Sequence, residues 1–441
     1  MKALQVILAL AILIVIHESG HFTFAKLFRI RVDKFFLFMD IGGIKLLSTK
    51  TGWFSKLCPW FKNNETEYGI GWLPLGGYCK VNGMIDESLD LDTMKQDPKP
   101  WEFRTKPAWQ RLLVMAGGVL YNFIFAILAF SMILSIWGEG YIKADNDIYV
   151  NELAYDMGFR TGDRIIRYDD YVPEDFGMLQ ADLARRNVHK AVVLRNSDTV
   201  SIYIDQARIG EVLNSPFMFD VALPFVIDSV PATSHNAAAG LVRGDRIIAL
   251  DSTATPYRQD IAKMLHTNAG RSLEATVVRG ADTLGVDLQV DSTGMLGVYM
   301  EQYPFVHRTY GNFIKAIPEG TKKMFSSIGG YVRDLRLVAT PSTKAYKSVG
   351  SFIAIGQVIP SSWNWYAFLT YTALLSIMLG VMNLLPIPGL DGGHIVFTVY
   401  EMITGHKPSD RFLTAAQIIG MILLFGLMIL AFGNDIGRLM H

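Results

Sequence analysis

The sequence predicts an α-helical membrane protein with about four transmembrane helices, a cytoplasmic membrane-associated β-hairpin and two tandem α+β modules between the second and third spans. Three observations support this fold class. Half of the 441 residues are apolar. Four apolar runs are long enough to cross a bilayer as helices. The stretch between the second and third runs is not membrane-like and contains an internal duplication.

Composition argues against several other classes of protein. The chain has 41 basic and 41 acidic residues, so its net charge gives no reason to expect nucleic acid as a partner. Its two cysteines, Cys58 and Cys79, are too few for a disulfide framework. A single Lys2 precedes the first apolar run and no small-residue cleavage site follows it, which favours a retained span over a signal peptide.

The first predicted span, residues 3–28, carries ionisable groups where apolar side chains are expected. His17, Glu18 and His21 form a His-Glu-x-x-His pattern, and on a helix the two histidines lie on one face about a turn apart. Two such imidazoles can bind one Zn²⁺, with Glu18 beside a metal-bound water as general base. A chance match is the competing explanation, but unliganded histidines inside an apolar span would only cost stability.

The first loop, residues 29–111, has basic residues close to both of its ends, which places it in the cytoplasm. Within this loop, residues 68–84 contain five glycines and short apolar runs. This composition predicts a glycine-rich hairpin that lies against the membrane. The edge of such a hairpin could bind an extended peptide by strand addition, whereas a plain glycine-rich connector is the alternative.

The second predicted span, residues 112–137, contains one strongly polar residue, Asn122. Before any family resemblance is considered, Asn122 is as well explained by an interhelical hydrogen bond as by a functional role. Gly117 and Gly118 precede it and allow the backbone of another helix to approach closely.

Two copies of one motif lie about eighty residues apart in the region 138–310. Residues 156–169 read DMGFRTGDRIIRYD and residues 238–251 read AAGLVRGDRIIALD, and both fit a Gly-Asp turn followed by an apolar strand. The motif resembles the Gly-Asp element of PDZ domains, which predicts two PDZ-like domains over 138–215 and 216–303. Such domains bind extended peptides by strand addition, although they could instead act only as spacers.

Residues 304–362 are predicted to form an amphipathic helical connector, because basic residues alternate there with apolar ones, as in helices that lie on a membrane surface. The third predicted span, residues 365–386, follows this connector, and residues 413–432 form the fourth.

The third span ends where Pro386 and Pro388 must break the helix. Asp391 follows this break and is the best candidate for a third metal ligand, since a catalytic zinc site needs three protein ligands and one open position. His394 is the competing candidate three residues further on, and the neighbouring glycines allow either.

The predicted topology places the chain ends and the inserted modules on the periplasmic side, with the connection between the third and fourth spans in the cytoplasm. Residues 1–137 then form an N-terminal membrane half and residues 363–441 a C-terminal membrane half. In this topology His17, His21 and Asp391 come to one depth, towards the cytoplasmic side.

With these motifs, the chain resembles the site-2 protease family of intramembrane zinc metalloproteases, peptidase family M50, in its bacterial RseP-like branch. HESGH at 17–21 and NLLPIPGLDGGH at 383–394 carry the resemblance. PLGGY at 74–78, Asn122 and the inserted pair of modules support it over nearly the whole chain. One departure is Gly118-Val119, where the family often has a Gly-Pro pair.

The resemblance implies a multi-pass protease of the bacterial inner membrane with Zn²⁺ as cofactor. His17, His21 and Asp391 would be the ligands and Glu18 the catalytic residue. A role in substrate binding is implied for Asn122, Asn383, Gly76 and Gly77. Single-span membrane proteins, such as anti-sigma factors or remnant signal peptides, would be the substrates, in contact with the lipid bilayer.

Two other classes of function fit parts of the sequence. A catalytically inactive membrane scaffold could bind peptide ligands through its PDZ-like domains, but an inactive member should lack a histidine, the glutamate or the aspartate, and all four are present. A zinc transporter or sensor could use the same ligands, but transport needs no general base between two histidines.

Overall fold

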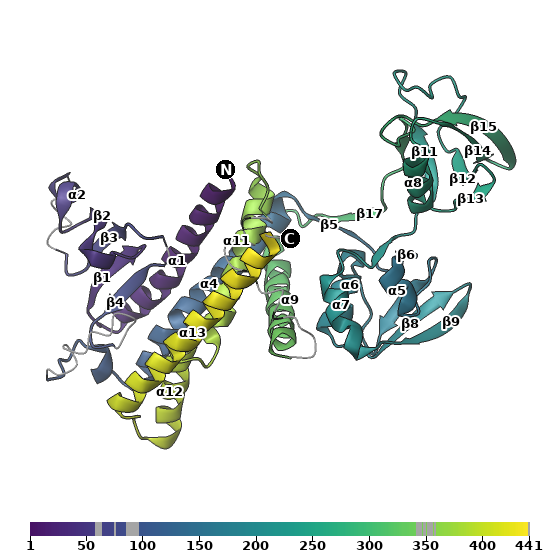
Figure 1. The fold of residues 1–441 in the computed structure, drawn as a ribbon. Helices are drawn as coiled ribbons and strands as arrows, with labels where there is room; N and C mark the ends of the chain where they lie inside the picture. The colour runs from purple at the N-terminus through teal and green to yellow at the C-terminus, as the bar shows by residue number, and fades with distance from the viewer. Residues whose placement is uncertain are drawn as a thin grey trace. The chain divides into compact units, whose positions relative to one another are not determined.

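The computed structural model describes residues 1–57, 64–74, 76–84, 97–340 and 359–439, together with Tyr346, Gly350 and Gly356. Cys58 and part of the predicted connector 304–362 lie outside the described residues. The chain divides into two compact units (Figure 1). One unit consists of Met1–Gly138, Thr309–Ala339 and Tyr346–His441, and the other of Glu139–Arg308 and Thr340–Ala345.

Four helices among the described residues of the first unit are long and apolar enough to cross a membrane: α1 (Lys2–Leu27), α4 (Ala108–Ile136), α11 (Trp365–Leu384) and α13 (Asp410–Leu439). They confirm the four apolar helices predicted from the sequence. Large apolar side chains point outward from them, and on α13 Ile422 and Ile429 are 67% and 70% exposed. Such a surface suits lipid better than water.

Small residues let the helices of this unit approach α4 closely. A Cβ atom on Gly20 of α1 would overlap the carbonyl group of Gly117 in α4. On the α11 side, a Cβ atom on Gly380 would lie 2.7 Å from the ring of Phe123. Because lipid removes the hydrophobic drive between helices, this close packing is what holds them together in a bilayer.

The predicted connector contains α9 (Phe313–Ala339), which packs along α4. Ala316, Gly320 and Met324 are buried, and a Cβ atom on Gly320 would overlap the Ser131 side chain of α4. The range of the predicted connector thus contains a helix with one buried face. The buried face of α9, however, packs on α4 and does not lie on a membrane surface. The spacing of apolar residues shows that a helix has a buried face, but it does not show which element covers that face.

A four-stranded sheet lies beside α1 (Figure 1). Its strands are β1 (Val32–Leu37), β2 (Lys45–Ser48), β3 (Glu67–Gly71) and β4 (Tyr78–Val81), and the short helix α2 (Gly52–Leu57) follows β2. The strand order is β2-β3-β1-β4, with β1 parallel to β3 and antiparallel to β4.

This order contradicts the predicted β-hairpin over residues 68–84. The two strands of that range, β3 and β4, do not pair with each other, because β1 lies between them and bonds to both. Glycines and short apolar runs indicate that the chain reverses direction. They do not indicate that β3 and β4 each pair with β1, residues 32–37, which lies about thirty residues or more earlier in the sequence.

The second unit contains two α+β modules. The first has β6 (Ile148–Val150), α5 (Glu152–Asp156), β7 (Arg164–Tyr168), α6 (Leu179–Arg185), β8 (Lys190–Arg195), β9 (Asp198–Tyr203), α7 (Ile209–Asn214) and β10 (Phe219–Val221). The second has β11 (Phe225–Ser229), β12 (Arg246–Leu250), β13 (Thr253–Ala254), α8 (Arg258–Thr267), β14 (Ser272–Arg279), β15 (Asp282–Gln289) and β16 (Tyr299–Met300). The entering strand β5 (Glu139–Ile142) pairs antiparallel with the leaving strand β17 (Phe305–Arg308).

The duplicated Gly-Asp motif has the same buried ion pair in both copies. Asp163 is fully buried and accepts hydrogen bonds from the Arg195 guanidinium, 2.7 Å from Nε and 2.8 Å from the terminal nitrogen. Asp245 is likewise fully buried and accepts from Arg279, at 2.8 Å and 2.7 Å. The turn before β7 is thus tied to the end of β8, and the turn before β12 to the end of β14, so the repeat has a structural reason.

Candidate metal centre

Helix α1 places two imidazoles on one face at its buried side. His17 and His21 are 8% and 7% exposed, and their rings meet edge to face with centroids 4.9 Å apart. The two Nε2 atoms are 3.3 Å apart. The four-residue spacing therefore produces the arrangement that the sequence predicted, with both Nε2 atoms turned to one point.

Asp391 comes to the same point from the first turn of α12 (Asp391–Thr404). Its Oδ2 atom lies 3.2 Å from His17 Nε2 and 3.4 Å from His21 Nε2. This oxygen is buried and has no hydrogen-bond partner. Its contacts with the two imidazoles are therefore close, but their geometry is not that of a hydrogen bond.

The break between α11 and α12 brings the Asp391 carboxylate to this position. A Cβ atom on Gly392 would overlap the Leu385 carbonyl, and one on Gly393 would lie 2.7 Å from the Ile387 carbonyl oxygen. The chain therefore folds back tightly on its own backbone just before the helix starts. The glycines are required here for close approach, rather than only for flexibility as the sequence suggested.

The three donor atoms fit a zinc ion. Zinc in proteins is tetrahedral with bonds to imidazole nitrogen and carboxylate oxygen of about 2.0–2.2 Å, which puts neighbouring ligand atoms about 3.3 Å apart. The observed separations of 3.2, 3.3 and 3.4 Å match this edge length. A buried carboxylate oxygen without a hydrogen bond is also what a missing cation leaves behind.

A second layer of contacts orients the imidazoles. His21 Nδ1 lies 2.8 Å from the Val114 carbonyl oxygen of α4, which can only accept, so Nδ1 carries the proton and Nε2 is free to bind a metal. His17 Nδ1 lies 3.1 Å from Asn122 Nδ2, and His17 Nε2 lies 3.3 Å from Asn383 Nδ2. Both predicted asparagines thus contact His17.

Glu18 and the glycines of the PLGGY motif lie on the sheet side of α1. The Glu18 carboxylate accepts a hydrogen bond from the backbone N–H of Cys79 in β4, the edge strand of the sheet. Gly76 and Gly77 lead into this strand, and a Cβ atom on Gly77 would overlap the Ile14 side chain of α1. The structure therefore brings the edge of β4 up to the helix that carries the histidines.

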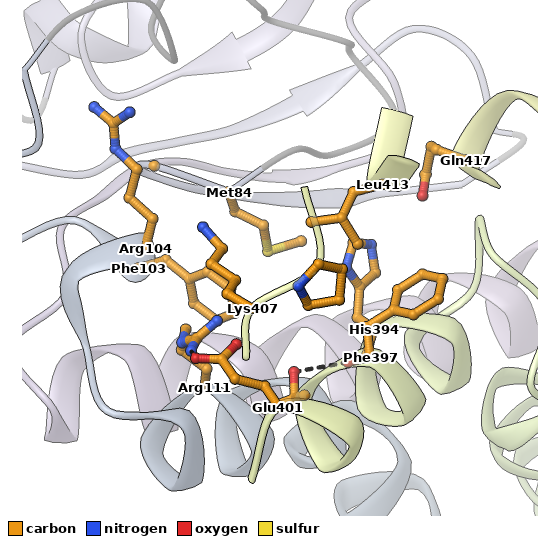
Figure 2. A pocket seen from close by; sticks show the side chains of 13 residues that line it. Met84, Phe103, Arg104, Arg111, His394, Phe397, Glu401, Lys407, Leu413 and Gln417 are labelled. Atoms are coloured by element: carbon orange, nitrogen blue, oxygen red, sulfur yellow. Dashed lines mark hydrogen bonds and ion pairs between the residues drawn. The ribbon is translucent and has the colours of Figure 1, made fainter. Parts of the chain in front are cut away.

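His394, the competing ligand candidate, is not part of the three-donor cluster. It lines a cavity beside α12 together with Phe397 and Glu401 of the same helix (Figure 2). In this cavity the Arg111 guanidinium of α4 donates to Glu401 Oε1 at 2.5 Å. The ion pair joins the first turn of α4 to the last turn of α12, the helix that begins with Asp391.

Similarity to known proteins identifies the family of this chain. Residues 5–427 match peptidase family M50. The chain belongs to this family. It is 29% identical to the regulator of sigma-E protease RseP of Escherichia coli K12 and 28% identical to protease RseP of Yersinia pestis, with 98% of each chain covered. A relative in Xylella fastidiosa, named as a zinc metalloprotease, is 26% identical over 98% of this chain and 97% of its own.

The M50 membership makes this chain a membrane zinc metalloprotease of the site-2 protease type, as the resemblance implied. Sequence reasoning missed Ser376, and it gave Gly118 a role in helix packing without its closeness to the imidazoles. Ser376 donates to the Asn122 carbonyl oxygen at 2.9 Å, and a Cβ atom on Gly118 would lie 2.5 Å from His21 Nε2. The sequence features that could have indicated these contacts were the polar Ser376 in the third span and the Gly117-Gly118 pair in the second.

Proposed function

We propose that this M50 protease cleaves peptide bonds within the membrane-spanning segments of single-span proteins, with His17, His21 and Asp391 as zinc ligands. The observation that carries this proposal is the convergence of two Nε2 atoms and one Oδ2 atom at tetrahedral spacing, between helices apolar enough to cross a membrane. Three protein ligands leave a fourth position for water or substrate.

When bound, zinc lowers the pKa of the attacking water and polarises the scissile carbonyl group. The Glu18 carboxylate takes the proton of that water and later delivers it to the nitrogen of the leaving amine. The hydrogen bond from the Cys79 N–H keeps Glu18 on the sheet side of α1, next to the histidine that precedes it. Glu18 is therefore the catalytic acid and base of the proposed reaction.

A helical substrate must unwind before its carbonyl groups become accessible, because helical carbonyl groups are already hydrogen-bonded. The edge strand β4, entered through Gly76 and Gly77, is positioned to pair with an unwound segment by strand addition. The Asn383 amide, in the last turn of α11, supplies further hydrogen-bond donors close to the reaction centre.

We further propose that the reaction takes place towards the cytoplasmic side of a bacterial inner membrane, with the two α+β modules in the periplasm. The basic residues at the ends of the first loop support this orientation. In this orientation the modules, proposed to be PDZ-like, would restrict access to substrates whose outer domains have already been trimmed. Anti-sigma factors and remnant signal peptides are the substrate classes that fit.

The test compares wild type, Glu18→Gln and wild type with a zinc chelator on a single-span model substrate in detergent. We expect cleavage by untreated wild type only, with about one zinc per chain in both proteins. A Glu65→Gln variant is the matched control, since Glu65 is largely exposed and its ion pairs with Lys26 and Arg31 lie on the surface. Loss of zinc in Glu18→Gln would make Glu18 structural, and a zinc-loaded wild type that cleaves none of several substrates would favour a peptide-binding scaffold.

A further inference from the structure

The Asn122 side chain lies beside Nδ1 of His17, the ring nitrogen that does not face Asp391. Its side chain is fully buried in α4, with Nδ2 3.1 Å from His17 Nδ1. The Asn122 backbone is held by the Ser376 hydroxyl, which donates to its carbonyl oxygen. Its own Oδ1 is buried without a hydrogen-bond partner, a costly state for an amide oxygen inside a protein.

The hydrogen bonds around His17 cannot all form as they stand. A neutral imidazole has one nitrogen that donates and one that accepts. Yet the amide nitrogens of Asn122 and Asn383 face its two ring nitrogens, at 3.1 Å and 3.3 Å, and both amide nitrogens are donors. If Nε2 of His17 binds the metal, Nδ1 carries the ring proton, and the amide that faces Nδ1 must present its oxygen to the ring.

The buried Oδ1 of Asn122, which has no hydrogen-bond partner, fits this requirement. If the Asn122 amide is flipped, so that Oδ1 and Nδ2 exchange places, the unpaired Oδ1 faces His17 Nδ1 and accepts a hydrogen bond from Nδ1–H. His17 then carries its proton on Nδ1 and has a free lone pair on Nε2, as a zinc ligand requires. His21 already has this arrangement with the Val114 carbonyl oxygen.

We propose that Asn122 is a positioning residue that sets the metal-binding tautomer of His17 by accepting a hydrogen bond from Nδ1–H. This inference rests on the proposed ligand set. It replaces the substrate-binding role expected for Asn122, because a fully buried amide bonded to a ligand is not available to a substrate. Asn383 keeps its proposed substrate role, since its donor faces Nε2, the nitrogen that a metal would occupy.

The experiment measures the zinc affinity of the full-length protein in detergent by competition with a chromophoric chelator. Asn122→Leu keeps a similar volume but removes the acceptor, so its zinc affinity should fall about 10- to 100-fold. Asn122→Asp keeps an acceptor in every orientation and should bind zinc at least as tightly as wild type. Thr372→Val is the matched control, since it removes a buried polar group whose hydroxyl donates to the Phe368 carbonyl oxygen of its own helix, and it should leave zinc affinity unchanged.

Two results would overturn this inference. Asn122→Leu with wild-type zinc affinity would show that the tautomer needs no acceptor there. If Asn122→Leu does not fold, Asn122→Asp decides: weaker zinc binding than wild type contradicts the proposal, and equal or tighter binding supports it. A wild-type protein that binds no zinc would instead refute the proposed ligand set itself, so the two failures are distinguishable.

Discussion

Replacing Gly118 by alanine should weaken the metal site without destabilising α4. A Cβ atom at this position would lie 2.5 Å from His21 Nε2 and 2.6 Å from His17 Cε1. Ordinary van der Waals contact begins at 3.4 Å, so the imidazole of His21 would have to retreat by roughly 0.9 Å. Zinc ligands tolerate displacements of only about 0.2 Å from their ideal distances.

The expected loss of zinc affinity is therefore about 100-fold or more, which corresponds to roughly 2.7 kcal/mol. The helix itself should not suffer, because alanine favours a helix over glycine by about 1 kcal/mol. The assay measures zinc affinity by chelator competition and, separately, the thermal unfolding of the zinc-free protein. We expect the first to fall sharply and the second to change less, because the helix preference of alanine offsets part of the overpacking between α4 and α1.

Gly426→Ala is the matched control for this prediction. Gly426 lies in α13, another helix apolar enough to cross a membrane, and a Cβ atom there would meet nothing within 4 Å. Its zinc affinity should equal that of the wild type. If Gly118→Ala also binds zinc like the wild type, α1 and α4 can separate at little cost, and the close packing cannot be what holds the imidazoles.

Two further predictions concern the ion pairs. In a double-mutant cycle of Arg111→Met and Glu401→Leu, we expect a coupling of about 2 kcal/mol in thermal or denaturant stability, because the buried Arg111 and the half-buried Glu401 each become an uncompensated charge when left alone. Additive effects would contradict this. The Arg279 guanidinium lowers the pKa of the Asp245 carboxylate, an effect that burial opposes and the Val242 N–H reinforces. The folded state then binds fewer protons than the unfolded state, so this contribution is present above about pH 4 and is lost as pH falls through the lowered pKa. The protection factors of the β12 and β14 amides, which are exchange rates compared with the intrinsic rate at the same pH, should fall in acid in the wild type and depend less on pH in Asp245→Asn.

The outcome for residues 68–84 shows where local patterns stop being informative. The range contains two strands as expected, but β1 lies between them. Turn-forming residues act over a few positions, whereas strand pairing is decided by side-chain packing between distant segments. The duplicated Gly-Asp motif was visible because both copies need the same buried carboxylate. The arginines that bond to it lie about thirty residues further on, in a second pair of similar segments, AVVLRNSDT at 191–199 and ATVVRGADT at 275–283, whose pairing with the carboxylates only the structure showed.

By itself, the sequence determined the four apolar helices and the pair of histidines, because hydropathy and helical spacing are local properties. It also narrowed the third ligand to Asp391 or His394. Only the tertiary structure decided that the Asp391 carboxylate meets both imidazoles, since this depends on how the backbone folds at Gly392 and Gly393. The partners of His17 and the closeness of Gly118 were decided in the same way, because contacts between helices are set by their packing and not by the order of residues along any one of them.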